Sequence, residues 1–129
     1  HIPSSGISLT DEVRYDSYRR AFDFYKDLFG GDRIVLCCGS WLLYPKHEEF
    51  LPENSNILRF MRDFEIVRSA ESDDFGNAWR VFGRYADLPP EELPKDTALR
   101  KAYAEWLEAG NNAGDGYGVI VFDGEKIIT

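Results

Sequence analysis

The sequence predicts an α/β (or α+β) fold, in which helices flank a mixed β-sheet that ends in a C-terminal β-hairpin. An apolar run, Ile34–Trp41, stops at a Gly-Ser-Trp corner and predicts a central strand buried on both faces. Before it, aromatic residues spaced three and four apart predict a long helix that ends near Phe29. After it, Asp123-Gly124 between two apolar segments is typical of a type I′ hairpin turn.

The first helix is capped by Ser8 or Thr10, and it ends at the glycine pair 30–31. One stripe of this helix is expected to face the core, and its members are Tyr15, Tyr18, Ala21, Phe22, Phe24, Tyr25, Leu28 and Phe29. The elements predicted after the central strand are a short helix over 46–50, a second one capped by Asn54 or Ser55, a strand over 65–70, a short helix over 77–84, a helix from Asp96 to Gly110, and hairpin strands Tyr117–Phe122 and Glu125–Ile128.

The start of the chain suggests a βαβ unit. His1-Ile2 has the character of a strand end, and the right-handed crossover through the first helix would place it parallel to Ile34–Trp41. The loops Pro3–Gly6 and Gly39–Trp41 would then meet at one edge of the sheet, where open α/β sheets bind ligands. Because the chain begins inside an element, we expect residues 1–129 to be one domain and a C-terminal fragment of a longer protein.

Composition limits the class of protein. The formal charge of −8 disfavours binding to nucleic acid and to anionic membranes, and no apolar stretch reaches the ~18 residues of a membrane span. The two cysteines, Cys37 and Cys38, are neighbours in a strand and cannot easily bond to each other, so a reduced cytoplasmic location is expected. No cluster of residues has the spacing of a metal site.

Small residues at Pro3, Ser4, Ser5 and Gly6 could hold a phosphate ahead of the helix, or form an ordinary turn. The glycines of 114–118 could do the same, but a tight turn or β-bulge is favoured there. No G-x-G-x-x-G or P-loop pattern supports either phosphate site.

Two hydroxyl groups and one imidazole could take part in chemistry. Ser40 lacks the G-x-S-x-G context of a nucleophile, and Trp41 beside it would be core or the wall of a pocket. His1 could act as a general base, although a surface histidine is the favoured explanation. Tyr117 could donate a proton, and a core tyrosine explains that position equally well.

One short helix carries a further candidate binding group. Asn56 and Arg59 could face a groove and bind a carboxylate or phosphate, although a solvated helical surface is favoured.

Several motifs together resemble a known family. They are His1-Ile2-Pro3-x-x-Gly6, Cys38-x-Ser40-Trp41-Leu42-Leu43-x-Pro45, Leu51-Pro52-x-x-Ser55-Asn56-Ile57-Leu58-x-Phe60 and Trp79-x-Val81-Phe82-Gly83. This pattern resembles the C-terminal GNAT-like domain of bacterial two-domain acyltransferases, over nearly the whole chain. The resemblance implies a GNAT-type sheet and acetyl-CoA or another acyl-CoA as cofactor. The family's phosphate loop, Arg/Gln-x-x-Gly-x-Gly/Ala, corresponds to residues 1–6, which keep only one of its glycines.

The sequence therefore predicts an acyl-CoA-dependent N-acyltransferase domain, in which an amine attacks the thioester directly. Pro3–Gly6 would bind phosphate, Ser40, Trp41, Asn56 and Arg59 would contact the acyl group or acceptor, and His1 and Tyr117 would move protons. The alternative is a non-catalytic domain that supports an N-terminal partner domain or recognises the acceptor. An open sheet edge could also form a homodimer.

Overall fold

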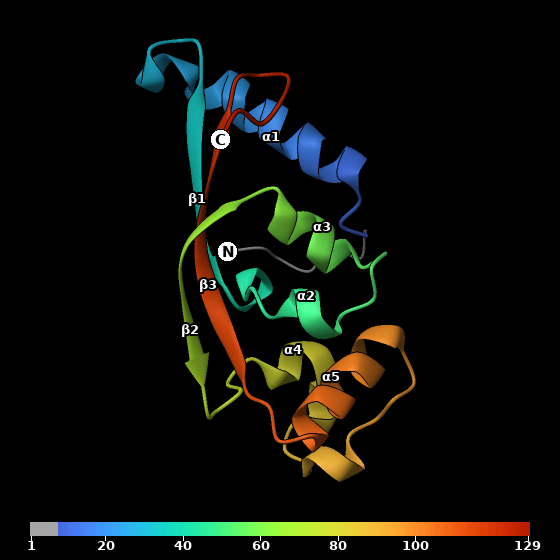
Figure 1. The fold of residues 1–129 in the computed structure, drawn as a ribbon. Helices are drawn as coiled ribbons and strands as arrows, with labels where there is room; N and C mark the ends of the chain where they lie inside the picture. The colour runs from blue at the N-terminus through green and yellow to red at the C-terminus, as the bar shows by residue number, and fades with distance from the viewer. Residues whose placement is uncertain (1–7) are drawn as a thin grey trace.

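The computed structural model describes residues 8–129 and contains one three-stranded sheet (Figure 1). Strand β3 (Ala113–Phe122) lies between β1 (Ile34–Ser40) and β2 (Glu65–Ser72), and it is antiparallel to both. The predicted layered class is confirmed. The expected parallel partner, His1-Ile2, lies outside the described residues.

The helices labelled α1 to α5 lie on one side of this sheet (Figure 1). The helical elements are α1 (Asp11–Tyr25), η1 (Lys26–Phe29), η2 (Trp41–Leu43), α2 (His47–Phe50), α3 (Asn56–Arg62), α4 (Ala78–Phe82), η3 (Gly83–Tyr85), η4 (Pro90–Glu92) and α5 (Ala98–Glu108), where η denotes a 3-10 helix. Of the two caps expected for each of α1 and α3, Thr10 and Ser55 are the ones that form. Thr97 and not Asp96 caps α5. No helix in residues 8–129 is long and apolar enough to cross a membrane.

The prediction that Ile34–Trp41 is a central strand buried on both faces is wrong for the described sheet. Among residues 8–129, β1 is an edge strand, and its side chains alternate between the helices and the open face. Ile34 is 0% exposed, whereas Val35 is 41% exposed. The run looked continuous because the outward positions, Val35 and Cys37, are also apolar.

Glycines 114, 116 and 118 lie inside β3, so the expected tight turn is wrong, whereas a register shift of the β2–β3 pair does lie opposite Tyr117 and Gly118. All three are on the face toward the helices. A Cβ at Gly116 would overlap the carbonyl oxygen of Leu43, and one at Gly118 would lie 2.8 Å from the Cβ of Phe64. Bare backbone in β3 therefore lets η2 and the end of α3 pack directly on the sheet. The irregular register is in β2, between Ile66 and Arg68.

The apolar side chains form two separate cores on the helical side. The smaller core contains Tyr18 from α1 with Ile34 from the start of β1 and with Ile120 and Phe122 from the end of β3. The larger core lies between the start of β3 and the helices η2, α2, α3, α4 and α5. Its buried members are Leu43, Leu51, Leu58, Phe60, Met61, Val81, Phe82, Leu93, Tyr103, Ala104 and Ala113. Strand β3 thus contributes to both.

Part of the predicted aromatic stripe of α1 does not reach the core. Tyr15, Tyr18 and Phe22 make edge-to-face contacts with Phe122. Phe24 and Leu28, however, are each 80% exposed, and Tyr25 and Phe29 are nearly half exposed. Phe24 lies within α1 but two residues after Phe22, about 200° around the helix, so it faces away from the core. Leu28 and Phe29 lie in the 3-10 helix η1, which begins at Lys26 and no longer follows the α-helical spacing.

The predicted C-terminal hairpin is reduced to a four-residue turn and one isolated bridge, Phe122 to Ile127. The Asp123 carboxylate accepts hydrogen bonds from the backbone N–H groups of Glu125 and Lys126, both at 2.9 Å. Asp123 has a negative φ and only Gly124 is left-handed, so the turn is not type I′.

Candidate functional site

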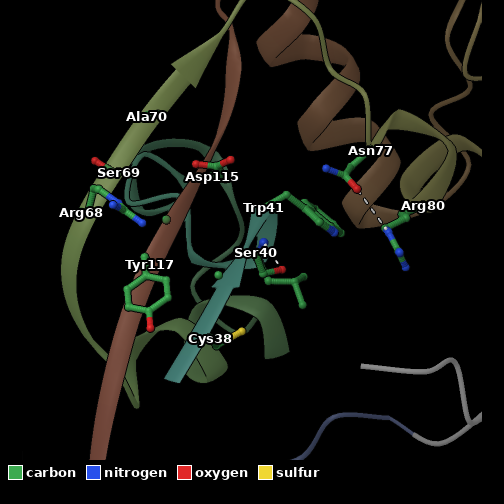
Figure 2. Close-up of a pocket in the computed structure, with 13 residues that line it drawn as sticks. Cys38, Ser40, Trp41, Arg68, Ser69, Ala70, Asn77, Arg80, Asp115 and Tyr117 are labelled. Atoms are coloured by element: carbon green, nitrogen blue, oxygen red, sulfur yellow. Dashed lines mark hydrogen bonds between the residues drawn. The ribbon is translucent and has the colours of Figure 1, made fainter. Parts of the chain in front are cut away.

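A cavity of about 600 Å³ opens where β1 ends, beside the first half of β3 (Figure 2). Strands β1 and β3 form its floor, β2 one wall, and the turn into η2 and the start of α4 the other. The residues that line it are Cys38, Gly39, Ser40, Trp41, Leu42, Arg68, Ser69, Ala70, Asn77, Arg80, Asp115, Gly116 and Tyr117.

Ser40 shapes this cavity through the backbone. Its Oγ accepts a hydrogen bond from the N–H of Leu42 at 3.1 Å and so caps η2. The turn presents the ring of Trp41 to the cavity, while the same ring makes edge-to-face contacts with His47 and Tyr103, at centroid distances of 6.0 and 5.9 Å. One side of the Trp41 ring therefore lines the cavity, and the ring also packs against the larger core.

Tyr117 projects from β3 opposite Gly39 of β1, and a Cβ at Gly39 would lie 3.2 Å from its ring. The guanidinium of Arg68 lies over the ring, 5.4 Å from the centroid. A hydrogen bond with Cys37 raises the pKa of Tyr117 above its ordinary value. The phenol therefore stays protonated at neutral pH and is able to donate a proton.

Five polar residues of the cavity are not among the sequence candidates, namely Arg68, Ser69, Asn77, Arg80 and Asp115. Asn77 accepts a hydrogen bond from Arg80 Nε at 3.3 Å. Asp115 interrupts the glycines of β3, and that interruption was a signal in the sequence. The positions of Arg68 and Arg80 depend on the pairing of β2 and on the fold of α4, which local spacing does not reveal.

The structure brings Ser40, Trp41 and Tyr117 to one cavity, but it places Asn56 and Arg59 on α3, away from the cavity lining. His1 and Pro3–Gly6 lie outside the described residues. Within residues 8–129, no group of three or more histidine, cysteine or acidic side chains could hold a metal ion. Cys37 and Cys38 are both free.

His47 is buried behind the cavity with 0% exposure. Its Nε2 and the hydroxyl of Tyr103 form a hydrogen bond, while Nδ1 has no hydrogen-bond partner in the described residues. Burial lowers the pKa of His47 to about 4 and raises that of Tyr103. His47 is therefore neutral at physiological pH.

The fold of this chain is similar to that of several solved acyltransferases. The chain is similar to an acyltransferase solved in complex with decanoyl-CoA and teicoplanin, with a TM-score of 0.76 and 30% identity over 95% of this chain and 39% of that chain. It is also similar to an acyltransferase in complex with decanoyl-CoA, with a TM-score of 0.73 and 34% identity over 92% of this chain and 38% of that one. A mutant acyltransferase in complex with octanoyl-CoA gives a TM-score of 0.76 and 29% identity over 94% of this chain and 39% of that one.

The chain thus spans about two fifths of the length of these relatives. No curated protein matches it. A family model described as the GNAT-like C-terminal domain matches residues 1–120, which confirms the resemblance seen in the sequence. The chain belongs to the family of GNAT-like C-terminal domains.

Proposed function

We propose that this chain is the GNAT-like part of an acyl-CoA-dependent N-acyltransferase, which transfers an acyl group from the thioester to an amine. One observation carries the proposal: a cavity with a proton donor, Tyr117, opens at the end of β1 in a chain that is 30% identical to an acyltransferase solved with decanoyl-CoA. Acyl-CoA would be the donor substrate.

The transfer needs no covalent enzyme intermediate. The neutral amine nitrogen forms a bond to the thioester carbonyl carbon, and the carbon–sulfur bond then breaks. The leaving thiolate takes a proton from the Tyr117 hydroxyl, and the ammonium proton is lost to a base, which restores the charge balance. The raised pKa of Tyr117 means that the phenol still carries its proton at neutral pH when the sulfur departs, although it also makes the phenol a weaker acid than an ordinary tyrosine.

Residues at the start of the chain complete the proposal. The family resemblance supports phosphate binding by Pro3–Gly6 and proton transfer by His1, both ahead of α1. The walls given by Ser40 and Trp41 would enclose the acyl group or the acceptor. Asn56 and Arg59 would contact a distant part of a long substrate, because they do not line the cavity. The two free cysteines support a reducing compartment such as the bacterial cytoplasm.

We further propose that an N-terminal domain of the same protein docks on the end of α1 and on η1. The relatives' chains are more than twice as long as this one, so most of each lies outside the matched region. Phe24 and Leu28 form an exposed apolar pair one helical turn apart, flanked by Tyr25 and Phe29. Contiguous apolar surface of this kind is typical of a contact between domains.

The test of acyl transfer is isothermal titration of CoA and decanoyl-CoA, followed by thiol release with amines. It uses this chain and a longer version that carries an N-terminal domain of the relatives' size. Tyr117→Phe should lower kcat by about 10- to 1,000-fold while the KM for acyl-CoA changes little, because the proton is needed only as sulfur leaves. Binding of acyl-CoA by neither version would overturn the proposal. Binding by the longer version alone would favour the supporting role for this chain.

The docking surface is tested with Leu28→Ser, which removes exposed apolar area and leaves both cores intact. It should weaken the association of the separately expressed domains by about 10-fold, since burying a leucine contributes roughly 1.5–3 kcal/mol. The exposed Val67→Ser, on β2, is the matched control and should have no effect. If Leu28→Ser instead dissociates a homodimer, the occupant is a second copy, and the domain-docking proposal is wrong.

A further inference from the structure

The cavity holds two arginines that have no acidic partner. Within residues 8–129, eight lysines and arginines form ion pairs, but none of these pairs includes Arg68 or Arg80. A chain with a formal charge of −8 offers abundant carboxylates, so two unpaired guanidinium groups at one cavity point to an anionic group from outside.

Both arginines are held in place by neighbours. Arg68 lies on β2 with its guanidinium over the ring of Tyr117, and Arg80 lies on α4 over the ring of Trp79, 4.4 Å from its centroid. The hydrogen bond from Arg80 Nε to Asn77 leaves the Nη groups of Arg80 available to a ligand. In Figure 2 the two arginines flank the cavity from opposite walls, with Asp115 and Trp41 between them.

Asp115 gives the same cavity one negative group. It is exposed on β3 and, like the arginines, takes part in none of the ion pairs of the described chain. A carboxylate attracts an ammonium group and can accept its proton. The cavity therefore presents both signs of charge within one enclosure, as a ligand with both an amine and a carboxylate requires.

We propose that this cavity binds the acceptor, and that the acceptor is an amine that also carries a carboxylate, as an amino acid or the C-terminal part of a peptide does. Arg68 and Arg80 bind the carboxylate, and Asp115 takes the ammonium proton so that the nitrogen can attack. This inference rests on the acyl transfer proposed above and specifies the acceptor of that reaction.

The test measures acyl transfer by the protein that carries this chain, with decanoyl-CoA and a panel of amino acids and dipeptides. Each acceptor is matched with its C-terminal amide, which removes the charge and changes the shape little. The unaltered protein should prefer the acids by about 10-fold or more in kcat/KM, as expected for a charge-assisted pair. Arg80→Gln and Arg68→Gln should each remove most of this preference through the acceptor KM, while the KM for decanoyl-CoA stays constant.

Arg19→Gln is the matched control, because it makes the same charge change on α1, away from the cavity, and should leave the preference intact. Equal rates with acids and amides would overturn the acceptor assignment but leave acyl transfer standing. Binding of decanoyl-CoA without acylation of any panel member would also overturn it. Failure to bind acyl-CoA would instead overturn the proposed function, so the two failures are distinguishable.

Discussion

Burial of His47 makes the fold sensitive to mild acid. The imidazole is 0% exposed and packed among Trp41, Tyr44, Phe50 and Tyr103. No carboxylate of the described chain forms a hydrogen bond or an ion pair with it, so protonation would place an uncompensated charge inside the larger core. The folded state therefore favours the neutral form of the His47 imidazole.

The size of the effect follows from the two pKa values. Burial lowers the folded pKa from 6.5 to about 4. Between these values the unfolded chain binds a proton that the folded chain does not, so folding stability is fully present above pH 6.5 and falls as the pH drops toward 4. At about 1.4 kcal/mol for each pH unit, the loss approaches roughly 3 kcal/mol.

Urea unfolding followed by tryptophan fluorescence at pH 7.5, 6.5, 5.5 and 4.5 measures this loss directly. His47→Gln removes the titrating group, so its stability should change much less between pH 6.5 and 4.5. Tyr103→Phe should lower stability at every pH by about 1–3 kcal/mol, because it leaves the imidazole without its partner, and yet keep the acid slope. Equal slopes for the unaltered protein and His47→Gln would refute the reasoning.

Two further substitutions test the packing that positions the site. Gly116→Ala should destabilise the fold by about 2–3 kcal/mol in thermal melts, because its Cβ would overlap the Leu43 carbonyl. Gly76→Ala is the control and should change stability little, because the space around Gly76 is open. Equal effects of the two substitutions would contradict the close approach of Leu43 to β3. Asp63→Asn should cost about 3 kcal/mol in urea unfolding, because Asp63 pairs with the buried Arg14 at 2.7 Å, and a loss below about 1 kcal/mol would mean that solvent reaches the pair.

Local patterns were enough to predict most elements. The caps Thr10 and Ser55 were each narrowed to one of two candidate residues, because a side-chain oxygen before an amphipathic run is a local signal. The strand over 65–70 was also predicted correctly, apart from two extra residues at its end. These features depend on residues within one helical turn or one strand of each other.

Features that depend on pairing were missed. Whether Ile34–Ser40 is an edge or a central strand is decided by which strand lies beside it, and β3 is some 75 residues away in the sequence. The same pairing turns the glycines of 114–118 from an expected turn into strand β3.

The cavity was predicted only in part for the same reason. Ser40, Trp41 and Tyr117 were found because they stand at element ends or beside glycines. Arg68 and Arg80 come to the cavity from elements that look like ordinary solvated segments in the sequence, and only the tertiary fold brings them together.

Strand β3 has a mechanical consequence for this molecule. Its two ends belong to different cores, with Ala113 in the larger and Ile120 and Phe122 in the smaller, and the cavity opens beside its first half. Phe64 also packs against both cores, so a disturbance of one core can reach the other through β3 or through Phe64. The amides of β3 should exchange with deuterium more slowly than those of β1 or β2, and a ligand in the cavity should slow exchange in both halves of the molecule at once.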